Sequence, residues 1–488
     1  MREDKMTETW RGGQYRPLSQ ADAQRVLDGA YRVLSEAGAW VANKRGREAL
    51  KAKGAEVSDS DGIVRFPKAL VEDAIASAPS KVVLCGRDEK HDCVLENSNV
   101  HLGTGGTALY VLDRDTGERR PSEVRDLRDC ARLIDALEYV HLHTINVFPN
   151  EIDDKNAIDI NRFYWSLKHT KKHIMGGIYS VEGLKEAIAL AEMVAGSPQA
   201  LRERPFVSFI SLIISPLKID DTYGEIACVA AENGLPIVVP TEPICGTTSP
   251  ITPAANLVMH TADTLAGLCM VQAVAPGAPT IIGSVGSITD LRTMDHLSGP
   301  VERGMLNAGV SQIAQMIELP YYSTAGPTDS KLVDAQAAYE SAIGNLLVMM
   351  SGANYIHDAA GLMEFDLTVA YEKMVMDNEI IGMGGRVLEG IEVSDDTLAL
   401  DLICEQGPGG NFVAEMHTVE HMRDCFYEPT LSDRRHRPEW EAAGGPTATD
   451  LAKAKVESLL AQDDPGLFDS ALDAEIRERF PKIKNPSR

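Results

Sequence analysis

The sequence predicts an α/β protein whose main domain is a barrel of eight parallel strands, a (β/α)8 TIM barrel, with an N-terminal α+β extension and C-terminal helices. Short apolar runs of strand length recur along the chain, and most intervals between them carry apolar residues at helical spacing. About eight repeats of this alternation are typical of a parallel barrel. Small polar or turn residues follow most of the runs, which in a barrel places them on one rim. An open doubly wound sheet is the alternative.

Composition limits the possible functions. The chain has 488 residues, of which 44% are hydrophobic, and 47 basic against 72 acidic side chains give a formal net charge of −25. Such a surface disfavours nucleic acid and anionic membranes as partners. Eight scattered cysteines without a CxxC motif indicate reduced thiols, and the polar N-terminus has no apolar signal region. We therefore expect a cytoplasmic protein that contacts neither nucleic acid nor membrane.

The first 98 residues predict a mixed α+β region that precedes the barrel. Ser19 is a typical N-cap for an amphipathic helix that ends at Gly38, and residues 44–53 fit a second helix. Asp61-Gly62 is a hairpin signal, and Pro67 stands at the first position of a third helix.

The barrel is assigned to residues 99–418, and residues 419–488 form a C-terminal helical tail packed on it. The eight predicted strands are 141–147, 173–178, 206–214, 236–239, 280–284, 320–324, 353–357 and 400–405. The predicted helices are 159–168, 182–195, 219–233, 253–273, 300–317, 334–350 and 369–388.

The stretch after the sixth predicted strand forms a strand, a polar turn and a helix. Gly326-Pro327-Thr328-Asp329 ends the strand, and Lys331 stands just inside the turn. A lysine there is either a solvated charge paired with Asp329 or Asp334, or an anion-binding group. The sequence leaves both interpretations open.

Histidines offer a metal-binding alternative. His141 and His143 point to one face of a predicted strand, and His357 with Asp358 stands at another strand end. Metal-dependent hydrolases on a barrel use such strand-end ligands. The HExxH motif is absent, so we assign no metal ligand, and a metal-dependent amidohydrolase-like enzyme stays an alternative. The glycine runs 103–106 and 382–385 complete neither nucleotide-binding motif.

Four segments carry a family resemblance. Residues 328–340 (TDSKLVDAQAAYE), 352–362 (GANYIHDAAGL), 375–383 (VMDNEIIGM) and 407–423 (GPGGNFVAEMHTVEHMR) resemble the trimethylamine methyltransferase family, more closely its members without pyrrolysine. The resemblance extends from about Leu18 to the C-terminal helix and also implies a (β/α)8 barrel. The pyrrolysine of the trimethylamine enzyme would lie near the turn that holds Lys331. An ordinary side chain there fits the branch whose known substrates are quaternary amines such as glycine betaine.

Aromatic residues near strand ends are consistent with such a substrate. A methylated ammonium group donates no conventional hydrogen bond and is held by aromatic faces and nearby acceptors. The candidate substrate-binding residues, including two that could bind a betaine carboxylate, are Tyr110, Lys331, Tyr355, His357, Phe365 and Phe412.

The resemblance implies methyl transfer from a quaternary amine to the Co(I) of a cognate corrinoid protein. This chain would then hold no permanent cofactor, because the corrinoid (cobalamin) belongs to the partner. Catalysis would rest on orientation, so no catalytic residue is assigned. Relatives also suggest a homo-oligomer. A non-catalytic binding protein for methylated amines is a further alternative.

Overall fold

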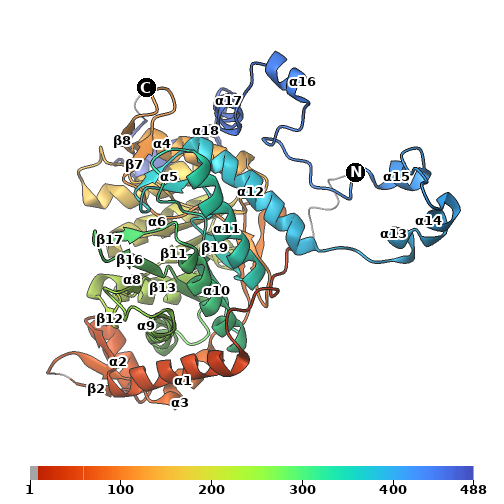
Figure 1. Ribbon diagram of the computed structural model, residues 1–488. Coiled ribbons are helices and arrows are strands. Elements are labelled where there is room, and N and C mark those ends of the chain that lie inside the picture. Colours follow the sequence, from red (N-terminus) through yellow and green to blue (C-terminus); the bar gives the residue numbers. More distant parts are fainter. Residues whose placement is uncertain (1–8, 59, 487–488) are drawn as a thin grey trace.

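A closed barrel of parallel strands forms the centre of the protein in the computed structural model, which describes residues 9–58 and 60–486 (Figure 1). All pairs of neighbouring strands in its sheet are parallel, and strands that follow each other in the chain are neighbours. A bridge between Gly103 and Leu142 joins the first strand to the second, which closes the ring. The barrel strands are β6 (His101–Leu102), β9 (Leu142–Thr144), β10 (His173–Gly177), β11 (Val207–Ile210), β13 (Ile237–Thr241), β15 (Thr280–Ser284), β18 (Tyr321–Thr324) and β19 (Tyr355–His357).

Seven of the eight predicted strands are confirmed, and one is wrong. Residues 400–405 do not form a strand but lie in helix α14 (Leu400–Gln406), outside the sheet. The missing strand is β6, which precedes the glycine run 103–106. Two residues, a histidine and a leucine, are too short a run to stand out from their surroundings by periodicity.

Each barrel strand is followed by a helix on the outer layer, and the seven predicted helices are confirmed within a few residues. Polar N-caps set several starts: Asp154, Ser180, Asp220 and Asp334 each accept a backbone N–H of the following first turn. The helices are α4 (Val124–Ala136), α5 (Lys155–His169), α6 (Val181–Ala195), α8 (Asp221–Glu232), α9 (Pro253–Val274), α10 (Val301–Met316), α11 (Ala335–Ser351) and α12 (Tyr371–Glu389), with a short α7 (Pro198–Glu203) after α6.

Helix α9 is the one helix of the described ranges that is long and apolar enough to cross a membrane by length and composition. However, 78% of its most apolar window is buried inside the protein. It packs against β13, β15 and three N-terminal helices. Its apolar character is therefore accounted for by its place in the core.

The N-terminal region packs its helices on α9 at one side of the barrel (Figure 1). Ser19 accepts the backbone N–H of Asp22, and Asn43 accepts that of Gly46, so both predicted helix starts are capped. Its helices are α1 (Gln20–Glu36), α2 (Lys44–Ala52) and α3 (Lys68–Ser77); its small sheet contains β1 (Ala39–Val41), β2 (Glu56–Val57), β3 (Ile63–Arg65) and, from the barrel domain, β12 (Lys218–Ile219).

A hairpin closes the amino-terminal end of the barrel. Strands β4 (Val82–Leu84) and β5 (Cys93–Leu95) flank a single 3₁₀ turn, η2 (Glu89–His91). Their apolar side chains join those that point to the barrel axis in one buried cluster. The barrel members of that cluster are Leu142, Met175, Val238, Ile281, Tyr322 and Tyr355. Because this end is filled, the opposite end is where polar side chains can meet a ligand.

Short strands at the carboxyl end of the barrel surround that opening, which we call the mouth. One group contains β14 (Ile244–Cys245), β16 (Ser287–Asp290) and β17 (Asp295–Leu297). The other contains β7 (Tyr110–Leu112), β8 (Arg119–Pro121), β20 (Leu362–Met363) and β21 (Thr368–Val369). These segments follow the barrel strands β13, β15, β6 and β19 in the chain, and so they begin at the mouth.

Beyond α12 the chain leaves the barrel and then returns. Helices α13 (Asp395–Leu398), α14 and α15 (Met416–His421) lie in a segment that extends away from the body (Figure 1). The remaining helices are α16 (Arg437–Ala442), α17 (Ala448–Leu460) and α18 (Ser470–Arg479). Helix α17 packs on α12 and α4, and α18 packs on α6.

Candidate functional site

Five titratable side chains from five different elements or loops meet at the mouth, and we call them the mouth cluster. Glu242 directly follows β13, His296 lies in β17, and Arg303 lies in the first turn of α10. Asp358 directly follows β19, and Asp366 lies in the turn between β20 and β21. The carboxyl ends of parallel strands bring these distant positions together.

Arg303 is the cationic centre of the mouth cluster. Its side chain is 3% exposed, and its Nη2 lies 3.0 Å from Asp366 Oδ2 and 3.7 Å from Asp358 Oδ2. Burial alone would lower the pKa of Arg303, but the carboxylates of Asp366 and Asp358 outweigh it and raise this pKa. Burial would likewise raise the pKa of Asp366, and the Arg303 guanidinium beside it holds that pKa well below its usual range. The guanidinium is thus neutralised by its own neighbours.

Glu242 is the most accessible carboxylate of the cluster. Its side chain is 37% exposed, and its Oε1 lies 3.7 Å from His296 Nδ1. Desolvation raises the pKa of Glu242, opposed by His296 and Arg303 and reinforced by Asp366 and Asp358. Three carboxylates therefore face one guanidinium, which leaves the mouth with surplus negative charge whenever Glu242 is ionised.

Backbone conformation marks the same region. Asp358, Glu364, Phe365 and Asp366 all have positive φ angles, between 50° and 66°. Left-handed backbone at non-glycine residues costs on the order of 1 kcal/mol or more each and gathers at functional sites. In this chain it fixes the two aspartates that hold Arg303.

Tyr322 and His357 lie beneath the cluster. The His357 ring stacks on Tyr322 with 4.1 Å between ring centroids. Its Nδ1 donates to the carbonyl of Ser323 at 2.6 Å, and its Nε2 lies 2.9 Å from Asp358 Oδ2. Asp358 also accepts from the hydroxyl of Thr324 at 2.7 Å. The stacked rings of Tyr322 and His357, which we call the aromatic floor, are thus in direct contact with the Asp358 carboxylate.

The structure brings some of the six sequence-derived residues together and separates others. His357 lies at the mouth, and Tyr355 lies deeper, where its hydroxyl contacts the Thr104 carbonyl and the Thr144 hydroxyl. Lys331 lies at the rim, with Nζ 4.3 Å from the centroid of the Phe365 ring and 2.7 Å from the Asp329 carbonyl oxygen.

Tyr110 and Phe412 have different surroundings. The Arg119 guanidinium lies over the Tyr110 ring at 3.6 Å, so this ring already has a cation on its face. Phe412 lies between α14 and α15, in the segment that extends away from the body, and the structure does not bring it to the mouth.

Sequence reasoning missed most of the mouth cluster. Glu242 stands in a turn that the pattern marked as following a strand, and Asp366 is the neighbour of Phe365, so both carried a positional signal. His296 and Arg303 carried none, because a hairpin strand and a helix start bring them to the mouth.

The histidine pair at the start of β9, His141 just before the strand and His143 within it, is hydrogen-bonded to other groups of the protein. His143 contacts the Thr104 hydroxyl through Nδ1 and the Ser166 hydroxyl through Nε2. His141 Nδ1 accepts the backbone N–H of Leu102. Among the described residues, the one group with metal-ligand geometry is instead Glu242, His296 and Asp366, whose ligand atoms lie within 4.8 Å of one another. These three groups could bind a cation. The Arg303 guanidinium would compete with that cation for the Asp366 carboxylate.

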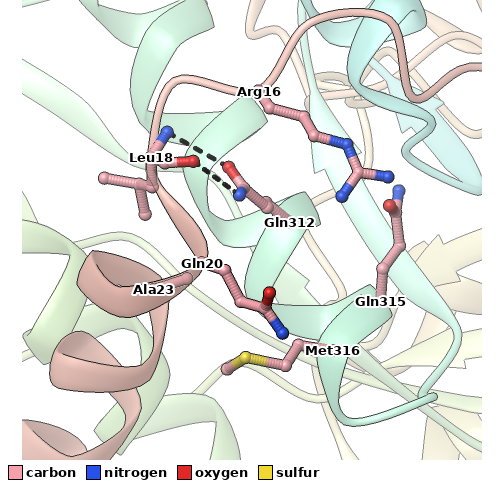
Figure 2. A pocket seen from close by; sticks show the side chains of 7 residues that line it. All are labelled: Arg16, Leu18, Gln20, Ala23, Gln312, Gln315 and Met316. Atoms are coloured by element: carbon pink, nitrogen blue, oxygen red, sulfur yellow. Dashed lines mark hydrogen bonds between the residues drawn. The ribbon is translucent and has the colours of Figure 1, made fainter.

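A separate hollow of about 420 Å³ lies at the other end of the molecule, between the N-terminal segment and the end of α10 (Figure 2). The side chain of Gln312 pairs with both backbone groups of Leu18, at 3.2 and 2.8 Å. Because the end of α10 lies at the amino-terminal end of the barrel, this hollow is remote from the mouth. We regard the Leu18–Gln312 pair as the anchor of the N-terminal segment.

A family model and the sequences of characterised relatives point to one family. A family model described as trimethylamine methyltransferase matches residues 3–485. The trimethylamine methyltransferase MttB of Desulfitobacterium hafniense is 35% identical over 94% of this chain and 92% of its own length. The glycine betaine methyltransferase of Desulfitobacterium hafniense strain Y51 is 28% identical over 95% of this chain and 96% of its own length. Among solved structures, a hydroxylamine complex of MtmB aligns with 96% of this chain and 98% of its own at a TM-score of 0.49 and 13% identity.

Proposed function

Because the chain belongs to the trimethylamine methyltransferase family, we propose that it transfers a methyl group from a quaternary amine, glycine betaine first, to the Co(I) of a corrinoid held by a separate protein. The glycine betaine methyltransferase among its relatives supports this substrate class. The observation that carries the proposal is the surplus negative charge of the mouth over an aromatic floor.

The mouth cluster suits a cation that donates no hydrogen bonds. A quaternary ammonium group is bound by Coulomb attraction and by aromatic faces. Glu242 is accessible and lies 3.7 Å from the nearest nitrogen of His296, so its carboxylate offers the first. The stacked rings of His357 and Tyr322 offer the second, with His357 on the side of the mouth.

The reaction is a displacement at the methyl carbon. The C–N bond breaks with its electron pair left on nitrogen, and the acceptor's electron pair forms the new bond to carbon. Since the leaving group is a neutral tertiary amine, no general acid is needed. The work of this chain is to hold the ammonium so that one methyl group points outward along the barrel axis.

The acceptor would approach from outside the mouth. Gly177 ends β10, two residues after the inward-facing Met175, and a Cβ on Gly177 would meet no atom within 4 Å. Open space therefore lies against this strand end. We propose that the partner's corrinoid covers the mouth and excludes water during transfer, and that the chain itself holds no permanent cofactor.

The direct test combines the purified chain with a Co(I) corrinoid protein or free cob(I)alamin and a panel of methyl donors. The panel contains glycine betaine, proline betaine, carnitine, γ-butyrobetaine, a sulfonium analogue and trimethylamine. Methyl-cobalt absorbance with a quaternary amine is expected. No such absorbance with any quaternary amine refutes the proposal, and calorimetric binding without transfer would indicate a binding protein instead.

Gly177→Val tests where the donor binds. Its φ angle is one that side chains adopt freely, and nothing obstructs the added atoms. We expect the free energy of unfolding to change by less than about 1 kcal/mol and kcat/KM for methyl transfer to fall roughly tenfold. Gly177→Ala should show a smaller loss, and Gly344→Ala, on the outer helix α11, none. Unchanged kinetics in Gly177→Val would move the donor site away from the mouth.

A further inference from the structure

The segment between α12 and Leu431, residues 390–430, forms what we call the arm. It extends away from the body on the side of the C-terminal end of α12 (Figure 1). None of its residues is buried, although it contains α13, α14 and α15. Because helices run opposite to the strands, it emerges at the amino-terminal end of the barrel, and so it cannot be a lid for its own mouth.

Hydrogen bonds from α12 hold the arm where it leaves the body and where it returns. Glu379, in α12, accepts the backbone N–H groups of Thr430, Leu431 and Ser432 where the arm returns. Burial would raise the pKa of Glu379, but these hydrogen bonds outweigh it and lower that pKa. At the other end, Arg386 donates to the carbonyl oxygens of Gly390 and Cys425, at 2.7 and 3.2 Å.

Large apolar side chains are exposed throughout the arm. Eleven of them are between 38% and 89% exposed. So many exposed large apolar side chains within one segment indicate an interaction site. The eleven are Ile391, Val393, Leu398, Leu400, Ile403, Phe412, Val413, Met416, Val419, Met422 and Phe426.

A second exposed apolar surface lies on the body, and we call it the outer face. It runs across α10, α11 and α12, which pack side by side, and includes Leu332 before α11. Its members are between 38% and 64% exposed, and nothing in the described chain covers them. They are Val301, Met305, Leu332, Tyr339, Ile343, Met383 and Val387.

We propose that the arm of one chain packs on the outer face of a second copy of the same chain. Both surfaces contain exposed apolar side chains. The arm extends away from α10 and α11, which carry much of the outer face (Figure 1). At roughly 60–100 Å² for each side chain, the arm offers on the order of 700–1,000 Å², close to the roughly 800 Å² that each partner contributes to a stable interface. One molecule thus supplies both halves of the contact.

Charge gives this interface a distinctive salt dependence. The arm contains nine acidic side chains and one arginine, on a protein whose formal net charge is −25. Copies therefore repel one another at low ionic strength, while the apolar contact is insensitive to screening. Association is expected to strengthen at least threefold between 20 and about 300 mM salt.

The first experiment measures the mass of the full chain by light scattering during size-exclusion chromatography, over a hundredfold range of concentration. The wild type is expected to be an oligomer. Val413→Asp/Met416→Asp in the arm and Ile343→Asp on the outer face should each raise the dissociation constant at least tenfold. The control is Ile251→Asp, which changes an isoleucine that is 55% exposed but lies outside both surfaces. Circular dichroism confirms that each variant folds.

Cysteines identify which chain the arm touches. Cys404 and Cys425 lie in the arm and are exposed, whereas the other six cysteines are buried. One tagged chain carries Ile343→Cys with Cys404→Ser and Cys425→Ser, and it is mixed with an untagged chain that keeps the native arm. A bis-maleimide is expected to join tagged to untagged chains. A monomeric wild type, an oligomer that the arm and outer-face variants leave intact, or a mixture in which no tagged chain is joined to an untagged chain would each overturn the proposal.

Discussion

Glu242→Gln is expected to lower kcat/KM for methyl transfer from a quaternary amine by roughly 30- to 150-fold. The change keeps the shape of the side chain and removes the accessible negative charge of the mouth. A carboxylate roughly 5 Å from a cation, at an effective dielectric constant of about 20–30, contributes about 2–3 kcal/mol. Each 1.36 kcal/mol is a factor of ten in rate.

The measurement is the initial rate of methyl-cobalt formation over a range of donor concentrations. Glu302→Gln is the matched control, because Glu302 lies exposed in the same first turn of α10 as Arg303. Its kinetics should equal those of the wild type. A loss of less than threefold in Glu242→Gln would place the ammonium group elsewhere than beside this carboxylate.

The pH dependence of the wild type gives a second readout of the same group. Burial raises the pKa of Glu242 above that of an ordinary glutamate. Since the ionised form binds the cation, kcat/KM should fall as pH falls through this raised pKa, earlier than an exposed glutamate would predict. The fall should be absent in Glu242→Gln.

Regular strands were predictable because they are long enough to show their pattern. The runs at 173–178 and 280–284 coincide with β10 and β15 to within one residue, since apolar residues fill both faces of a strand in a closed barrel. β6 has only His101 and Leu102, and its partners are set by ring closure rather than by its own composition. At 400–405, by contrast, a strand-like apolar run belongs to a helix of the arm.

The candidate site was predictable in part for a similar reason. His357 could be placed because it ends a clear strand. Tyr355 was expected near a strand end, but it begins that strand and lies deeper in the barrel. Arg303 and His296 reach the mouth through a helix start and a hairpin strand, and their positions depend on how these elements fold over the barrel. Phe412 matched the expected residue type, but the path of the chain after α12 takes it away from the barrel.

The largest effect on stability is expected for Lys373→Met. Lys373 is fully buried in α12, and its ammonium donates to Asp377 Oδ2 at 2.7 Å and to the Gly326 carbonyl at 2.9 Å. Asp377 in turn accepts from the Ser341 hydroxyl and the Gly361 N–H. This network ties α12 to α11 and to the loops that follow β18 and β19. Removal of one partner from a buried pair costs about 3–5 kcal/mol of unfolding free energy.

The sign of the pH dependence separates this mechanism from a simple packing defect. Burial already raises the pKa of Asp377, against the opposing effect of Lys373, and without the lysine this pKa rises further. When a carboxyl group has a higher pKa in the folded than in the unfolded protein, the protein loses stability as pH rises from the unfolded-state pKa to the folded-state pKa. Below the unfolded-state pKa, the group costs no stability. Urea unfolding of Lys373→Met should therefore show a smaller loss of unfolding free energy at pH 5 than at pH 7. Lys373→Met/Asp377→Asn should recover part of this loss at pH 7.

Lys185→Met, which removes an exposed lysine of α6, is the control and should cost less than about 1 kcal/mol at either pH. A deficit in Lys373→Met that is independent of pH would mean that lost packing, rather than an unpaired Asp377 carboxylate, causes the instability.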